Sequence, residues 1–295
     1  MTELAFAPDC PPPLDEIRAP ALRLPVGSTD CHFHAFGPYD RFPLAPERSY
    51  TPPESTLDGY RRVMKTLGLQ RCVVVQPSVY GTDNRCTLDA LASLGPTVAR
   101  GVAVIADDLD AQGLAALHAA GVRGVRYNSV TGARDTAGGL MALAERIAPL
   151  GWHLQMYAGA AEWQSLAPML GRLPVEVVID HLGEVDPAQG PKGAAFVSLM
   201  RFLETGRGWV KLVGYRCSHQ RAPYADLAPY VQALVKAHGD RLLWGTDWPH
   251  PIRFDDMPED GALVDAFGAW VEDPAARSKI LVDNPARLYG FTDRP

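Results

Sequence analysis

Short apolar segments of strand length recur along most of the chain, separated by longer segments in which apolar and polar residues alternate at helical spacing. Runs of this length, bounded by turn residues, are typical of buried strands. The pattern predicts strands at residues 28–36, 71–78, 99–105, 121–128, 153–159, 176–183, 209–215 and 241–248.

The longer segments predict helices. Residues 57–67 place apolar side chains on one face, and Ser55 and Asp58 are expected to form a capping pair at their start. Segments 139–151, 196–206 and 227–235 repeat the helical pattern. Glycines expected to end helices at positive φ are Gly68, Gly121, Gly151, Gly206 and Gly239.

This alternation of strands and helices predicts a (β/α)₈ TIM-type barrel over residues 27–295. Residues 1–26 are rich in proline and are expected to form an irregular arm. The alternative is an open doubly wound sheet, which usually has a glycine-rich turn after its first strand. No GxGxxG or GxxxxGK[ST] motif follows a predicted strand, so we favour the barrel.

Composition narrows the class of protein. With 295 residues, 47% hydrophobic and 21% charged, the chain resembles an ordinary globular protein. A net charge of −6 predicts no binding to nucleic acid or anionic membrane, so an anionic ligand needs a local cationic pocket. Five scattered cysteines and the lack of an export signal favour a reducing, cytoplasmic setting. The oligomeric state is not predicted.

Polar residues occur where the predicted strands end, which is where barrel enzymes have their active sites. They are His32, His34, Gln76, Ser78, Arg126, Asn128, Tyr157, Asp180, His181, Tyr215, Arg216 and Asp247. Strand alternation places His32 and His34 on one face, with Cys31 and Phe33 on the other.

Each candidate also has an ordinary structural explanation. A lone HxH motif is often a pair of surface or hydrogen-bonded histidines, and Asp247 could cap a turn. Three histidines beside one aspartate favour a functional site, in which Asp247 would act as a general base. The remaining histidines are expected on the surface or in the core; they are His118, His153, His219, His238 and His250.

Several motifs together resemble the amidohydrolase superfamily: HxH at 32–34, DHLG at 180–183 and GTDWPHP at 245–251. Three further stretches resemble its lactonase branch, the one typified by the pyrone-dicarboxylate hydrolases. They are DCHFHAFGPYDRFPLAPERSYTP at 30–52, QPSVYG at 76–81 and GVRGVRYN at 121–128. The likeness extends from about residue 27 to residue 291.

The resemblance implies a distorted barrel that opens a lactone by attack of water. Asp247 would activate the water, and His32, His34 and His181 would surround the lactone carbonyl. Residues matching those that hold the substrate carboxylates are Arg126, Arg216, Tyr50, Ser78 and Tyr157. The branch has a second arginine soon after the one on strand four, whereas this chain offers only Arg134, at a different spacing. If Arg134 does not reach the site, a different lactone is favoured.

Three histidines and an aspartate would also suit one Zn²⁺, held by His32, His34, His181 and Asp247. Binuclear members of the superfamily take further ligands from strands four and five, where this chain has Arg126 and Tyr157 or Gln155. We therefore favour a site without a metal, with a single Zn²⁺ as the alternative.

The expected function is hydrolysis of a small carboxylated lactone, with 2-pyrone-4,6-dicarboxylate, opened to 4-oxalomesaconate in aromatic catabolism, as the preferred substrate. Alternatives are a sugar-acid lactonase or lactone isomerase, a sulfomuconolactone hydrolase, a metal-dependent decarboxylase and a carboxylate-binding protein without activity.

Overall fold

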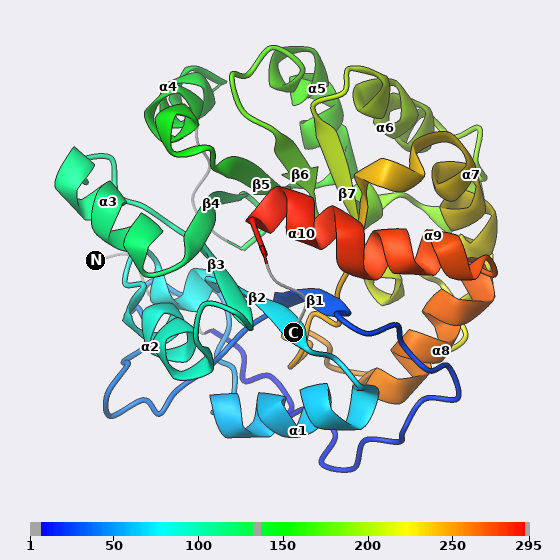
Figure 1. The fold of residues 1–295 in the computed structure, drawn as a ribbon, viewed down its shortest axis with the longest axis horizontal. Helices are drawn as coiled ribbons and strands as arrows, with labels where there is room; N and C mark the ends of the chain where they lie inside the picture. The colour runs from blue at the N-terminus through cyan, green and yellow to red at the C-terminus, as the bar shows by residue number, and fades with distance from the viewer. Residues whose placement is uncertain (1–6, 132–136, 293–295) are drawn as a thin grey trace.

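The computed structural model describes residues 7–131 and 137–292 and contains the predicted barrel. Eight parallel strands pair in chain order to form a nearly closed barrel, which confirms the barrel over the doubly wound sheet (Figure 1). The strands are β1 (Thr29–Phe33), β2 (Arg71–Val75), β3 (Ala99–Ala103), β4 (Val122–Asn128), β5 (His153–Tyr157), β6 (Val177–Ile179), β7 (Gly208–Leu212) and β8 (Leu242–Trp244).

Helices surround the strands on the outside of the barrel (Figure 1). They are α1 (Leu57–Leu67), α2 (Arg85–Leu94), α3 (Ala111–Ala119), α4 (Ala137–Ile147), α5 (Ala160–Leu170), α6 (Ala194–Glu204), α7 (Ala228–His238), α8 (Asp260–Trp270), α9 (Pro274–Ser278) and α10 (Asn284–Tyr289). In the described ranges, no helix combines the length and the apolar character needed to cross a bilayer.

Side chains alternate between the inside of the barrel and the layer between strands and helices. On β7, Trp209 belongs to the inner apolar cluster with Val73 of β2 and Leu243 of β8. Val210 and Leu212 belong to the larger cluster that includes the helices. Because Lys211 lies between these two outward residues, its ammonium group points into the barrel, where it is fully buried.

The barrel closes where β1 meets the segment after β8. The His34 N–H donates to the Trp248 carbonyl at 2.8 Å, and the Asp247 N–H donates to the His32 carbonyl at 2.7 Å. A Cβ on Gly245 would lie 2.8 Å from the His32 backbone nitrogen, so only glycine fits there. The seam therefore joins HxH to GTDWPHP directly.

Helix α10 covers the amino-terminal end of the strands and crosses the strand ring in Figure 1. Tyr289 and Phe291 belong to the inner apolar cluster, and the guanidinium groups of Arg71 and Arg100 lie over the Phe291 ring. This end of the barrel is filled, so the opposite, carboxyl end is free to carry a site.

Three local predictions were wrong. Helix α1 has Thr56 as its N-cap, with no side-chain capping bond, and the Ser55 hydroxyl donates to the Pro53 carbonyl instead. Gly239 has a φ of −55°, because a short 3₁₀ turn follows α7 there. Cys31 lies inside the barrel rather than beside Phe33, since the pairing of β1 with β2 is irregular between Asp30 and Phe33.

Candidate functional site

Four side chains predicted from the sequence converge at the carboxyl end of the barrel. Nε2 of His32 and Nε2 of His34 each lie 3.5 Å from Oδ1 of Asp247. The ring of His181 lies 5.0 Å from the ring of His32, centroid to centroid. At most 2% of any of these four residues is exposed. The structure thus brings together His32, His34, His181 and Asp247.

The two oxygens of Asp247 have different surroundings. Oδ2 accepts from Nε of Arg216 at 2.5 Å and from the Tyr215 hydroxyl at 2.5 Å. Oδ1 has no hydrogen-bond partner among the described residues and faces His32 and His34. The carboxylate is therefore anchored through one oxygen and keeps the other for a ligand.

Asp247 and His181 lie in segments whose backbone conformation is unusual. Asp247 has a φ of 62°, and His181, Leu182 and Glu184 have φ between 49° and 54°. Such left-handed values are uncommon in residues other than glycine and tend to occur at functional sites. Strand β6 accordingly ends at Ile179, earlier than the sequence pattern suggests, and the DHLGE segment turns His181 toward Asp247.

The two histidines of β1 differ in the groups that lie beside Nδ1. Nδ1 of His34 lies 2.7 Å from the Val75 carbonyl, which only accepts, so this nitrogen carries the hydrogen and Nε2 keeps a lone pair. Nδ1 of His32 lies 3.4 Å from Nζ of Lys211, and an ammonium group only donates. The same Nδ1 lies 3.5 Å from Oδ1 of Asp180, which only accepts, so both a donor and an acceptor stand beside it.

A buried polar network lies beneath the histidines. Nζ of Lys211 donates to Oε1 of Gln155 at 2.7 Å and lies 3.5 Å from Oδ1 of Asp180. Nε2 of Gln155 donates to Oδ2 of Asp180 at 2.9 Å. Lys211 was absent from the candidates drawn from the sequence, although a lysine flanked by apolar residues in a strand is a usable signal.

Burial and charge set the ionisation of the cluster. Burial tends to raise the pKa of Asp247, but the Arg216 guanidinium opposes this effect and helps to hold that pKa well below its usual range. Burial lowers the pKa of His181 to about 3. Burial and Lys211 lower the pKa of His32 well below its usual range. At neutral pH the cluster is therefore one carboxylate among neutral imidazoles.

A cavity of about 350 Å³ opens beside this cluster. Three of the residues predicted to bind substrate line it: Tyr50, Tyr157 and Arg216. Glu184 and Arg253 also line it and were not anticipated from the sequence. Burial raises the pKa of Glu184 to about 7, despite the opposing effect of Arg216.

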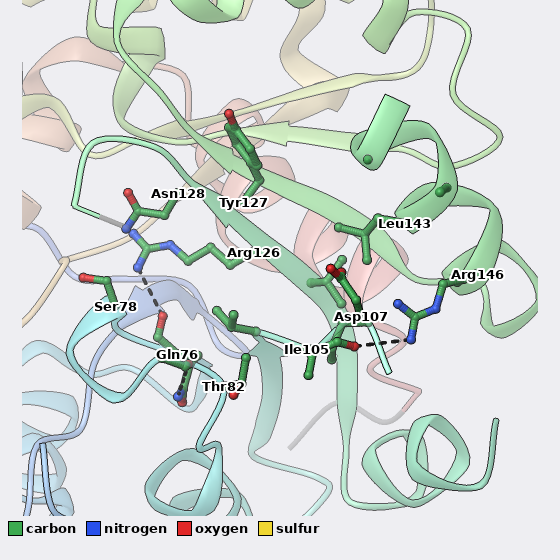
Figure 2. Close-up of a pocket in the computed structure, with 16 residues that line it drawn as sticks. Gln76, Ser78, Thr82, Ile105, Asp107, Arg126, Tyr127, Asn128, Leu143 and Arg146 are labelled. Atoms are coloured by element: carbon green, nitrogen blue, oxygen red, sulfur yellow. Dashed lines mark hydrogen bonds between the residues drawn. The ribbon is translucent and has the colours of Figure 1, made fainter. Parts of the chain in front are cut away.

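Arg126 and Ser78 line a larger cavity, of about 600 Å³, between β4 and α4 (Figure 2). The Arg126 guanidinium donates to the Gln76 carbonyl at 3.1 Å, and its Nη2 lies 3.9 Å from Oδ2 of Asp180.

Burial raises the pKa of the Tyr50 hydroxyl to about 12, while the Ser78 side chain tends to lower it. Arg134 lies outside the described residues.

The donor atoms could hold one metal ion. Ligand atoms of His32, His181 and Asp247 lie within 4.8 Å of one another. Three buried atoms, Nε2 of His32, Nδ1 of His181 and Oδ1 of Asp247, have no hydrogen-bond partner in the described part of the chain. This set fits a single Zn²⁺ in composition, whereas β4 supplies the cation Arg126 where a second ion would need an anionic ligand.

Comparison with known proteins agrees with this geometry. Residues 29–291 match the amidohydrolase family model. The 2-pyrone-4,6-dicarboxylate hydrolase of Comamonas testosteroni is 39% identical over 282 residues, which is 92% of each chain. The 4-sulfomuconolactone hydrolase of Rhizobium radiobacter is 37% identical over 302 residues, 97% of each chain.

A solved structure from Pseudomonas putida, assigned by its name to the 2-pyrone-4,6-dicarboxylic acid hydrolases, superposes with a TM-score of 0.81. It is 31% identical, and the match covers 92% of this chain and 100% of the other. The fold, the converging histidines and aspartate, and these matches lead to one assignment: the chain belongs to the amidohydrolase family.

Proposed function

We propose that this chain is a hydrolase that opens the ring of a small carboxylated lactone. One observation carries the proposal: Oδ1 of Asp247, ionised and without a hydrogen-bond partner among the described residues, faces His32 and His34 across 3.5 Å. A carboxylate in this arrangement can take a proton from a water molecule that attacks the lactone carbonyl.

The proposed roles divide between two sets of residues. Asp247 is the general base. His32 is the proposed donor to the oxygen that becomes negative during attack, and His181 lies beside it. Such stabilisation is often the largest catalytic effect. His34, which keeps a lone pair at Nε2, orients the attacking water.

Arg216, Arg126, Tyr50, Tyr157 and Ser78 are the proposed substrate-binding residues. Arginine binds carboxylates through two parallel charge-assisted hydrogen bonds, which are about twice as strong as neutral ones. A protein of net charge −6 needs such a concentrated cationic region to attract an anionic substrate.

The proposed substrate is 2-pyrone-4,6-dicarboxylate, opened by water to 4-oxalomesaconate. Support comes from the 39% identity to the hydrolase of that name over 92% of both chains. The second candidate is a sulfonated muconolactone, because a 4-sulfomuconolactone hydrolase is 37% identical over 97% of both chains. Both substrates are anionic lactones, and the same cluster would act on either.

A panel of carboxylated and sulfonated lactones, followed by the change in ultraviolet absorbance on ring opening, tests the proposal. We expect 2-pyrone-4,6-dicarboxylate to give the highest kcat/KM. Preference for the sulfonated lactone would select the second candidate, and an enzyme inert toward the whole panel would refute lactone hydrolysis.

We also propose that the reaction needs no metal and takes place in the cytoplasm. The support is electrostatic: Lys211, Arg216 and Arg126 place positive charge close to the cluster, which would disfavour a metal cation there. All five cysteines are free thiols, as expected in a reducing compartment. Metal analysis of protein purified without chelator is the test: stoichiometric zinc whose removal abolishes turnover would overturn the metal-free proposal.

A further inference from the structure

The 600 Å³ cavity has no part in the proposed reaction except through its wall at Arg126 and Ser78. It lies between α4, strand β4 and the segments that follow β2 and β3 (Figure 2). Figure 2 shows Leu143 projecting from α4 into this space. The apolar lining residues include Val104, Ile105, Val125 and Leu143. A volume of this size is in the range of small-molecule sites, about 300–1,000 Å³.

Arg126 stands between this cavity and the histidine cluster. Only 8% of the residue is exposed, and its Nε has no hydrogen-bond partner among the described residues. Its guanidinium also lies 5.8 Å from the centre of the Tyr157 ring, which belongs to the smaller cavity. A carboxylate bound to Arg126 would therefore lie where the two cavities meet.

Beyond Arg126 most of the lining residues are uncharged. Ser78 and Asn128 both bond to the Thr131 hydroxyl, at 2.9 and 2.7 Å, so these polar groups satisfy one another. Among the described lining residues, the other charged groups are Arg146 and Asp107. Both lie away from Arg126 in the sequence and in Figure 2. Nη2 of Arg146 donates to the Leu109 carbonyl at 2.6 Å. A group that extends from Arg126 into the cavity meets mainly apolar surface.

We infer that this cavity is a subsite for the apolar arm of a further class of substrate, beyond 2-pyrone-4,6-dicarboxylate, which has no such arm. The ligand class is a lactone with a carboxylate for Arg126 and an alkyl or aryl substituent that lies between α4 and the segment after β3. The lactone part of this inference rests on the proposed function; the binding of an apolar carboxylate does not.

Binding of straight-chain carboxylates, from butanoate to octanoate, measured by isothermal titration calorimetry, tests the subsite without turnover. Burial of each additional methylene should raise the affinity about fourfold until the cavity is filled. Ala142 is exposed on the cavity rim, and Ala142→Trp should block the cavity and abolish the increase in affinity with chain length. Leu143→Ala should reduce this increase, because it removes apolar surface from the cavity wall. Glu145→Trp, on the same helix outside the lining, is the matched control and should keep the gain.

An affinity that does not rise with chain length in the unsubstituted protein, or that rises equally in Ala142→Trp and Glu145→Trp, would overturn the subsite. The two proposals fail separately. A chain-length gain without hydrolysis of any lactone refutes the proposed function and leaves the subsite. Hydrolysis of an unsubstituted lactone without a chain-length gain refutes the subsite alone.

A pair of lactones completes the test. For a carboxylated lactone with a butyl arm, the kcat/KM of the Ala142→Trp variant should fall at least about tenfold. A loss of this size corresponds to about two methylenes that are no longer buried. The variant should keep kcat/KM for the same lactone without the arm. Equal losses on both substrates would show that the tryptophan disturbs the catalytic centre and would overturn the assignment of the cavity.

Discussion

Nε of Arg216 lies 2.5 Å from Oδ2 of Asp247, and the Tyr215 hydroxyl lies 2.5 Å from the same oxygen. Two strong donors thus hold one side of the carboxylate and leave Oδ1 for His32 and His34. An anchored carboxylate cannot rotate away from a water molecule placed at Oδ1, so the pairing serves orientation as well as charge.

Asp247→Asn should lower kcat by about 10²–10⁴-fold, the usual contribution of general base catalysis. The amide keeps an oxygen that can accept from Arg216 and Tyr215, so the folded structure should persist. Steady-state kinetics and thermal unfolding measure the two effects. The exposed Asp255→Asn is the control, and near-normal turnover of Asp247→Asn would refute its role as base.

Tyr215→Phe removes one donor from Oδ2 of Asp247. We expect the free energy of unfolding to fall by about 1.5–3 kcal/mol, the contribution of a hydrogen bond to a charged group. We also expect kcat to fall by up to about 10²-fold, because a small misplacement of a catalytic group costs that much. Tyr230→Phe, whose hydroxyl bonds only backbone carbonyls in the described structure, should lose stability without losing kcat. Unchanged kcat in Tyr215→Phe would contradict the positioning role.

Lys211→Met should destabilise the fold by about 3–5 kcal/mol, because it leaves Asp180 buried without its lysine. The double variant Lys211→Met, Asp180→Asn should recover part of the lost free energy of unfolding, since neither member of the pair is then charged. Urea unfolding of both single variants and the double variant forms a thermodynamic cycle. Losses that simply add would show that the two side chains do not stabilise each other.

Glu184 predicts a pH dependence of substrate binding. Its raised pKa of about 7 means that the side chain is neutral below pH 7 and a carboxylate above it. The added negative charge repels an anionic lactone in the cavity it lines, so KM should rise on the order of fivefold from pH 6 to pH 8. Glu184→Gln should remove this rise; a KM that rises equally in the variant would place the titrating group elsewhere.

Much of the fold could be predicted because the barrel repeats a simple pattern eight times. Each strand segment is apolar and short, and a helical segment with an apolar face separates most of them. The position of Cys31 could not be predicted, because the irregular pairing in β1 interrupts the alternation on which that prediction relied.

The site was predictable where residues follow regular strands. His32 and His34 face Asp247 as expected, while Tyr215 and Arg216 depart from alternation and both reach it. The reason is that β7 ends at Leu212 and a 3₁₀ turn over Gly214–Arg216 follows it, so strand alternation no longer applies there. The left-handed DHLGE turn is a second feature that strand alternation does not describe.

The seam between β1 and the segment after β8 has a consequence for biogenesis. His32 and Asp247 belong to opposite ends of the chain and meet only when the last strand docks against the first. A nascent or truncated polypeptide that ends before the segment after β8 therefore lacks Asp247, the proposed general base, and leaves the edge of β1 without this partner. During refolding, recovery of turnover should report ring closure itself, later than any signal from local helix formation.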